Sequence, residues 1–210
     1  MSGMELSEIG TGFADISLGS QSVFRSALEA LSYPGRVVAI DLTFEAPKAA
    51  NAASSGLLLA LLEPGSTLWL SPGLVNTDAA TWIAFHTDCK ITPEPQQADF
   101  AWIKNWDELP QLESFALGTD EYPDHSTTCV IDIADSSAAT ATTTSLRLTG
   151  PGIAHTSTIE QLGITTAQVK RFVEQWTQNQ ARFPRGVDLF FATDTSLIGL
   201  PRTTRIEILG

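Results

Sequence analysis

The stretch FPRGVDLFFATDTSLIGLPRTTRIEI, residues 183–208, carries the clearest information about how this chain folds. Two apolar runs, 187–192 and 196–200, are joined by the short polar segment TDT, which is typical of a β-hairpin. Residues 203–209 (TTRIEIL) predict a third strand directly after the hairpin. The chain therefore ends in antiparallel strands, and any sheet that includes them is mixed if its other strands are parallel.

Upstream of this stretch, predicted helices and strands alternate. Apolar periodicity predicts helices at 20–32, 53–63, 77–86 and 165–180, and strands at 36–42, 67–71, 98–103, 127–133 and 145–150. Proline interrupts a short helix at 105–114 and a connector at 90–97, and the polar run 136–144 reads as a loop. The alternation predicts an α/β layered fold with a mixed sheet in one domain, residues 20–210, after a partly ordered lead-in at 1–19.

Two of these helices have well-defined apolar faces. Helix 165–180 begins with a capping box of Thr165 and Gln168, and its apolar stripe contains Val169, Phe172, Val173 and Trp176. In helix 20–32, Phe24, Leu28 and Leu31 share one side, flanked by Val23 and Ala27.

Composition excludes several functional classes. The chain has 210 residues, 43% of them hydrophobic, and a net charge of −12, which repels nucleic acid and anionic lipid. Two cysteines without a CxxC motif, and three scattered histidines, predict no metal site and suit a reducing cytoplasm. The N-terminus lacks the features of a signal peptide, and the longest apolar run, 57–62, is too short to span a bilayer.

Positive charge is concentrated near the C-terminus. Residues 170–210 hold six basic and four acidic side chains, whereas residues 1–169 hold six basic and twenty acidic. Arg185, Arg202 and Arg205 are expected to cluster, because the hairpin returns the chain to its starting point. Asp188, within an apolar strand, requires a partner, and a structural ion pair with one of these arginines is the favoured interpretation.

The segment PRTTR (201–205) has the composition of an anion-binding clamp. Arginine binds carboxylates and phosphates in a bidentate manner, and the hydroxyl groups of Thr203 and Thr204 could add donors beside Arg202. An interface strand facing an acidic partner would have the same composition, and both interpretations stay open. His86, at the end of helix 77–86, is interpreted first as a helix-terminal hydrogen-bond donor and second as a substrate contact.

No nucleotide-binding or nucleophile motif accompanies these residues. The sequence contains no GxGxxG, GxxxxGK[ST] or GxSxG pattern, and LTGPGI (148–153) is interpreted as a structural turn. The sequence thus provides no self-sufficient catalytic set.

A series of motifs resembles one known family. FPRGVDLFF and LPRTTRIEI look like the closing signature of the PhnH family, a subunit of the bacterial carbon–phosphorus lyase core complex. VFRSALEALSYPGRVVAI (23–40), IAFHT (83–87), LGTDEYP (117–123) and LRLTGPGI (146–153) are similar to its earlier elements, in the same order. The resemblance covers residues 20–208, although 90–116 and 134–144 carry no matching motif.

The resemblance implies a fold, partners and a function. It implies a three-layer α/β/α sandwich similar to the large domain of pyridoxal-phosphate-dependent transferases, without that cofactor, in a homodimer that joins three other core subunits. The complex takes part in displacing adenine from ATP with a phosphonate, giving a ribose 1-phosphonate 5-triphosphate ahead of C–P bond cleavage. The resemblance supplies no catalytic residue for this subunit, so none is carried over.

Two alternatives stay open beside an accessory subunit. A free-standing pyridoxal-phosphate enzyme would need an aldimine lysine, and of Lys48, Lys90, Lys104 and Lys170 only Lys104, at a strand end, is a candidate. A small phosphate-ester or nucleotide binder would act through the C-terminal arginines.

Overall fold

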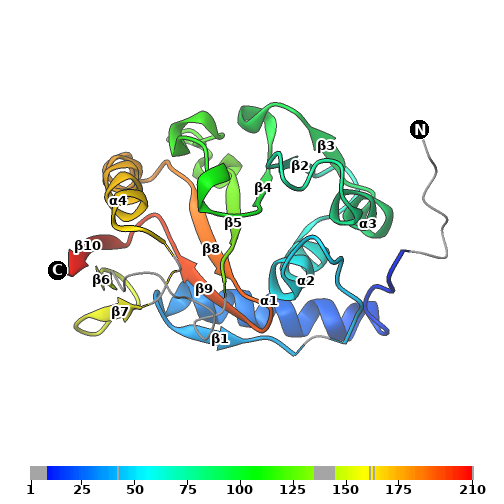
Figure 1. Cartoon of the computed structure of the whole chain (residues 1–210). Coiled ribbons are helices and arrows are strands. Elements are labelled where there is room, and N and C mark those ends of the chain that lie inside the picture. The colour runs from blue at the N-terminus through cyan, green and yellow to red at the C-terminus, as the bar shows by residue number, and fades with distance from the viewer. Residues whose placement is uncertain (1–8, 42, 135–144, 161, 163, 210) are drawn as a thin grey trace.

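A seven-stranded mixed sheet forms the centre of the protein (Figure 1). The computed structural model describes residues 9–41, 43–134, 145–160, 162 and 164–209. The strand order is β1-β9-β8-β5-β4-β2-β3, in which β3, β2, β4, β5 and β8 run parallel and β9 is antiparallel to both of its neighbours. The strands are β1 (Val37–Ala39), β2 (Thr67–Leu70), β3 (Lys90–Thr92), β4 (Phe100–Ile103), β5 (Thr128–Asp132), β8 (Asp188–Ala192) and β9 (Ser196–Leu200). The predicted mixed sheet and C-terminal hairpin are confirmed.

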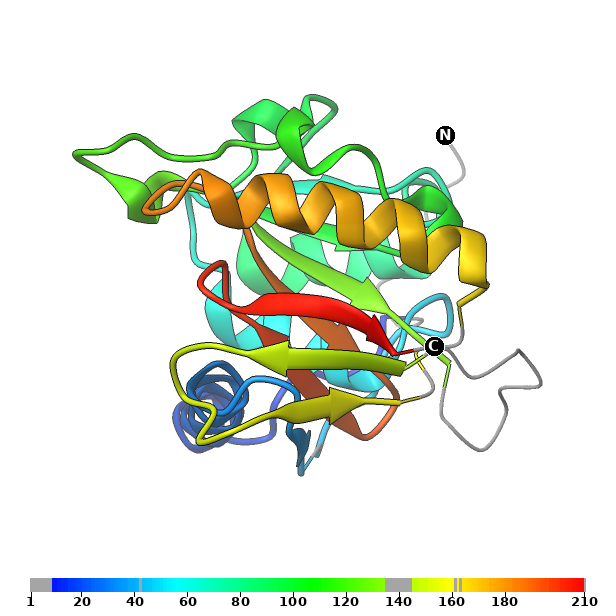
Figure 2. The same ribbon diagram turned by 90° about the vertical axis from the view of Figure 1, so that its left-hand side faces the viewer.

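Different layers cover the two faces of this sheet. Phe190 and Ala192 of β8 pack with α1 (Ile16–Ser32), α2 (Ala52–Leu61) and α3 (Asp78–Thr87) on one face. Leu189 and Phe191 pack on the other face with α4 (Thr166–Ala181) and a second sheet of order β10-β6-β7. Figure 2 shows this sheet beside α4; its strands are β6 (Ser145–Thr149), β7 (Ser157–Ile159) and β10 (Arg205–Leu209).

The α/β architecture is as predicted. On the second face of the main sheet, however, the outer layer contains the β10-β6-β7 sheet beside α4, whereas the expected α/β/α sandwich has only helices there. Leu146 and Leu148 of β6 and Ile206 of β10 are buried against the main sheet from strands rather than from a helix. Alternation of apolar and polar residues along β6 accounts for this arrangement, because one face of that small sheet is buried and the other is solvated.

Helix α4 forms as its sequence predicts. Thr165 accepts a hydrogen bond from the backbone N–H of Gln168, and the Gln168 side chain accepts one from the backbone of Thr165. Val169, Phe172 and Trp176 of the predicted stripe are buried. The capping box and the apolar stripe therefore act together to start and dock this helix.

Helix α1 docks on the sheet through the flank of its apolar stripe rather than through the stripe itself. Val23, Ala27 and Ala30 are buried, whereas Phe24 and Leu28 are about half exposed. The cause is the close approach of α1 to Gly199 of β9, where a Cβ atom would lie 2.5 Å from the carbonyl carbon of Ala30. Only small side chains fit this contact, so the small side of the helix docks and its large apolar side faces outward.

Several boundaries also differ from the expectation. Asp15 caps α1 by accepting the N–H of Leu18, so the helix begins at Ile16 instead of residue 20. β1 is limited to Val37–Ala39, and the connector and loop regions contain two unpredicted strands, β3 and β7, each at a sheet edge. The expected helix at 105–114 is two 3₁₀ turns around Pro110, η3 (Trp106–Glu108) and η4 (Leu112–Ser114).

Two further 3₁₀ turns are η2 (Pro95–Gln97) and η5 (Pro123–His125). The expected loop at 136–144 and the first half of the expected lead-in at 1–19 lie outside the described residues. Within the described part of the chain, no helix is both long enough and apolar enough to cross a membrane.

Candidate functional site

The β8–β9 hairpin brings Arg202 back to Asp188. Asp188 begins β8 and Arg202 follows β9, so the two lie side by side at the same end of the hairpin. The Arg202 Nε lies 3.1 and 3.2 Å from the two carboxylate oxygens, one terminal nitrogen lies 2.5 Å from Oδ2, and the Arg202 backbone N–H donates to Oδ1 at 2.7 Å. The predicted ion pair between Asp188 and one of the three arginines is confirmed.

The other donors of Arg202 are also engaged within the chain. Nη1 donates to the carbonyl oxygens of Pro123 and Pro184 at 2.8 and 3.2 Å, and Nη2 donates to Ser126 Oγ at 2.7 Å. A guanidinium has five N–H groups, and these contacts use all of them. With a side chain only 12% exposed, Arg202 therefore has no donor left for a phosphate, and it ties the chain to itself. We call Arg202, Asp188, Ser126 and the carbonyls of Pro123 and Pro184 the Arg202 centre.

The other two arginines have different surroundings. Arg185 lies on the loop before β8, where its Nε is 3.1 Å from Asp120 Oδ1 and its side chain is 46% exposed. Arg205 lies on the outer side of β10, and among the described residues it makes no ion pair. The three guanidinium groups share no acceptor: Arg202 pairs with Asp188 and Arg185 with Asp120, whereas Arg205 pairs with no acidic side chain among the described residues.

Thr203 and Thr204 belong to the turn between β9 and β10. Thr204 is fully buried, its N–H donates to the Pro201 carbonyl, and its own carbonyl accepts the indole N–H of Trp176 at 2.8 Å. Its hydroxyl has no hydrogen-bond partner among the described residues. Thr204 is thus not presented to a ligand at the surface, whereas Thr203 is only partly buried.

His86 lies on α3, and this helix is on the side of the molecule away from α4 and β10 (Figure 1). Its Nε2 is 2.9 Å from the Gly10 carbonyl, which also accepts the indole N–H of Trp82. Because a carbonyl only accepts, His86 Nε2 is the donor. The ring borders a cleft of about 500 Å³ that also contacts Phe13 and Phe85. His86 thus holds the segment before α1, and it is not part of the Arg202 centre.

A buried carboxylate, Asp132, which the sequence patterns do not single out, lies at the carboxyl ends of the parallel strands. Asp132 ends β5 and is 4% exposed; it accepts the backbone N–H of Asn51 at 2.9 Å and the indole N–H of Trp102 at 3.3 Å. Asn51, which precedes α2, donates its side-chain amide to the carbonyls of Ile133 and Ala192. The sequence around Asp132, TCVIDI, shows the same pattern as the sequence around Asp188, because both place a carboxylate within an apolar strand.

Burial raises the pKa of Asp132 to about 6, against hydrogen bonds from Ser54, Asn51 and Trp102 and the charge of Lys104, which lower it. Carboxyl ends of parallel strands are where open α/β sheets bind ligands. Here, however, the partners of Asp132 come from the start of α2 and from β4. The Asp132 carboxylate therefore links the start of α2 to the main sheet.

The next two strands meet in a second polar group. Ser71, after β2, donates to Glu108 at 2.5 Å and accepts the backbone N–H of Lys104, which follows β4. Glu108 also accepts the N–H of Gly73 at 2.8 Å, and the Lys104 ammonium donates to the Ala49 carbonyl. Lys104, the lysine considered as a candidate to form an aldimine with pyridoxal phosphate, is therefore hydrogen-bonded within the chain. In the described ranges, no group of three or more acidic, histidine or cysteine side chains could hold a metal ion.

The raised pKa of Asp132 predicts how stability depends on pH. The pKa is about 6 in the folded chain and near 4 when unfolded, so between these values the folded chain binds more protons. Relative to Asp132→Asn, the wild-type free energy of unfolding should therefore fall by about 1–3 kcal/mol from pH 4 to pH 7. Urea unfolding of both proteins at several pH values measures this difference. Asp124→Asn, at a carboxylate whose side chain is 78% exposed, is the control and should show no such trend.

Comparison with known proteins identifies the family. The profile described as "Bacterial phosphonate metabolism protein (PhnH)" matches residues 11–207. The chain is 36% identical over 195 residues, 93% of its own length and 94% of the relative's, to the alpha-D-ribose 1-methylphosphonate 5-triphosphate synthase subunit PhnH of Rhizobium meliloti (strain 1021). It is 30% identical over 191 residues, 90% of this chain and 87% of the relative, to a putative C-P lyase subunit protein, HtxG, of Stutzerimonas stutzeri. The resemblance carried by the motifs is thereby confirmed, and the chain belongs to the PhnH family of bacterial phosphonate metabolism proteins.

Proposed function

We propose that this chain is an accessory subunit of the enzyme complex that forms α-D-ribose 1-methylphosphonate 5-triphosphate in phosphonate catabolism. The observation that carries the proposal is the 36% identity with a subunit of that synthase, over nearly the full length of both chains. In this role the protein supports transfer of a phosphonate onto the ribose of ATP, with release of adenine, ahead of cleavage by the carbon–phosphorus lyase system.

The candidate site supports an accessory role. Arg202, Asp188, Asp132 and Lys104 all direct their polar atoms to groups of the same chain. Such groups stabilise loops and helix ends, whereas catalysis requires groups directed at a substrate. The reaction centre is then contributed by other subunits.

The test is co-expression of the tagged chain with the other synthase subunits of the same organism, followed by affinity purification and gel filtration. We expect co-elution of the subunits, and loss of growth on methylphosphonate as the phosphorus source when the gene is deleted. Separate elution together with undiminished growth of the deletion strain would exclude this function.

We propose further that the main sheet with α1, α2 and α3 corresponds to the large domain of pyridoxal-phosphate-dependent transferases, in a chain that binds no such cofactor. The support for the second part is Lys104, whose ammonium is bonded to the Ala49 carbonyl. Incubation with pyridoxal phosphate and borohydride should leave the protein colourless and without a lysine adduct. A stable adduct on Lys104 in mass spectra would favour the free-standing enzyme instead.

We also propose that the protein is a cytoplasmic homodimer. The support for the dimer is the outward side of α1, where Phe24 and Leu28 are 46% and 49% exposed, with Leu18 65% exposed one turn or more before them. Two free, buried thiols suit a reducing compartment. Analytical ultracentrifugation at micromolar concentration should give the mass of two chains, and Phe24→Asp should shift it to one. A monomeric wild type would exclude the dimer, and cell fractionation tests the compartment.

A further inference from the structure

Two loops at the amino ends of β5 and β8 are fastened together into one rigid corner. Arg202 donates to Pro123 on the first loop and to Pro184 on the second, at 2.8 and 3.2 Å. The Gly186 N–H donates to the Leu117 carbonyl at 2.8 Å, and Arg185 pairs with Asp120 across the same two loops. These cross-links hold residues 119–125 and 182–185, which we call the aromatic corner, in one arrangement.

The aromatic corner presents large aromatic side chains to solvent. Phe183 is 60% exposed and Tyr122 is 54% exposed. Tyr122 stacks on His125 with ring centroids 5.1 Å apart and planes 11° apart, so the two exposed rings pack on each other. Exposed apolar area is unfavourable in water. The hydrogen bonds and the ion pair that link the two loops do not involve these rings, so the rings do not stabilise the loops themselves. Aromatic residues and arginines are the residue types that contribute most to protein–protein binding.

The charges around these rings indicate which kind of partner fits. Asp120, Glu121 and Asp124 are exposed on the first loop, and Arg185 neutralises Asp120, while Asp124 lies 4.0 Å from the exposed His125. Arg182 on the second loop pairs with Glu113, so, among the described residues, the carboxylates beside Tyr122 that no arginine pairs with are those of Glu121 and Asp124, on a chain whose net charge is −12. Around a twofold axis, a second copy would place the same acidic loop against itself, which is unfavourable.

We propose that the aromatic corner is the surface by which this chain docks onto a different subunit of the synthase. The facing surface would have an apolar socket for Phe183 and Tyr122, bordered by lysine or arginine side chains that face Glu121 and Asp124. This inference rests on the proposed function, because that function requires contacts with other subunits. It also gives the Arg202 centre a role, namely to hold the corner in the shape in which it binds.

The experiment uses the chain co-expressed with the other synthase subunits. Phe183→Ala combined with Tyr122→Ala should raise the dissociation constant for the remaining subunits by at least about 30-fold. Phe85→Ala, at a phenylalanine that is 56% exposed on α3, is the matched control and should bind as the wild type does. The isolated variants should unfold at the wild-type temperature within about 2 °C, since both rings are exposed.

A second pair of variants tests the charge requirement. Glu121→Lys with Asp124→Lys should weaken docking at low salt by about tenfold or more, whereas Glu94→Lys, on another exposed loop, should not. Raising the salt concentration should reduce the difference between wild type and variant, because salt screens exposed charges.

Three outcomes would overturn the inference. If the aromatic double variant co-elutes as tightly as wild type, the corner is not the docking surface, although the proposed function stands. If the variant separates copies of this chain but leaves subunit docking intact, the occupant is a second copy. If the wild type itself never co-elutes, the proposed function fails and the inference fails with it.

Discussion

Replacing Arg202 by alanine should lower the free energy of unfolding by about 3–5 kcal/mol, the usual cost of removing one member of a buried ion pair. Asp188 would lose its counter-ion, and Ser126, Pro123 and Pro184 would lose their donor. Equilibrium unfolding in urea, followed by tryptophan fluorescence, measures the effect. A loss below about 1 kcal/mol would show that these contacts do little for the fold.

Lysine at the same position separates charge from geometry. Arg202→Lys keeps the charge, but one ammonium cannot reach Asp188, Ser126 and two carbonyls together, so we expect a loss of about 2 kcal/mol. Arg205→Lys, on the exposed side of β10, should stay within about 0.5 kcal/mol of wild type. We expect assembly with the other subunits to weaken in step with this loss. A complex that assembles normally but has lost ribosyl transfer would instead mean that Arg202 contacts phosphate.

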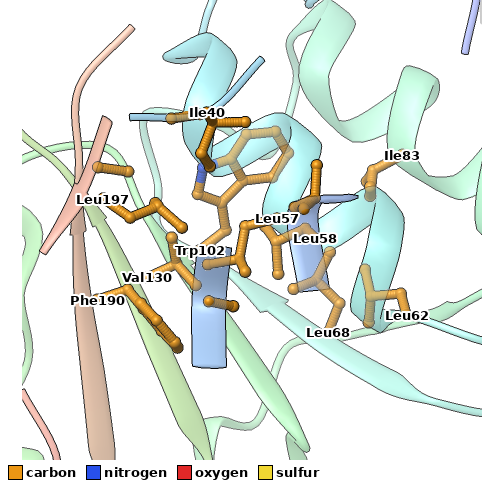
Figure 3. Close-up of a cluster of buried hydrophobic side chains, with 14 of the residues drawn as sticks. Ile40, Leu57, Leu58, Leu62, Leu68, Ile83, Trp102, Val130, Phe190 and Leu197 are labelled. Atoms are coloured by element: carbon orange, nitrogen blue, oxygen red, sulfur yellow. The ribbon is translucent and has the colours of Figure 1, made fainter. Parts of the chain in front are cut away.

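Replacing Trp102 by alanine should lower the free energy of unfolding by about 3–5 kcal/mol. Trp102 is fully buried under α2, among Leu57, Leu58 and Val130 (Figure 3). The change leaves a cavity in this core and also removes the indole N–H that serves Ser54 and Asp132. Urea unfolding measures the loss. A small loss of unfolding free energy would mean that α2 shifts to fill the cavity.

Phenylalanine at position 102 keeps an aromatic ring in the core and removes the indole N–H. The Trp102 indole N–H lies 3.1 Å from Ser54 Oγ and 3.3 Å from Asp132 Oδ1. Trp102→Phe should therefore cost about 2 kcal/mol and raise the pKa of Asp132 further, because the charged carboxylate loses a donor. Trp69, on the neighbouring strand β2, makes no indole hydrogen bond among the described residues, so Trp69→Phe is the control and should cost less than about 1 kcal/mol.

The parts of the fold that could be predicted are those set by local patterning. The capping box of Thr165 and Gln168 and the hairpin of β8 and β9 are encoded within a few residues each, and both form as predicted. The side of α1 that faces the core could not be predicted from α1, because Gly199, far along the chain, determines it. The edge strands β3 and β7 are three residues long, too short for a periodic signal.

The candidate site, like the fold, could be predicted only where a local sequence pattern determines it. A carboxylate in an apolar strand requires a partner, which correctly pairs Asp188 with one of the three arginines. Arg202 can use all of its donors within the chain only because the carbonyls of Pro123 and Pro184 lie within hydrogen-bond distance. Those carbonyls lie on loops whose paths are set by tertiary packing. The role of Asp132 could not be predicted from its strand, because its partner, Asn51, precedes a helix distant in sequence.

The position of β8 and β9 in the sheet has a consequence for biosynthesis. These strands are synthesised after β1 and β5, yet they lie between those two strands in the sheet. Until residue 200 leaves the ribosome, β1 has no strand to pair with and β5 presents a bare apolar edge. Pairing of such distant segments is slow, and open edges invite aggregation. Completion of this sheet therefore waits until β9 has been synthesised, and until then β1 and β5 each keep an edge open to non-native pairing.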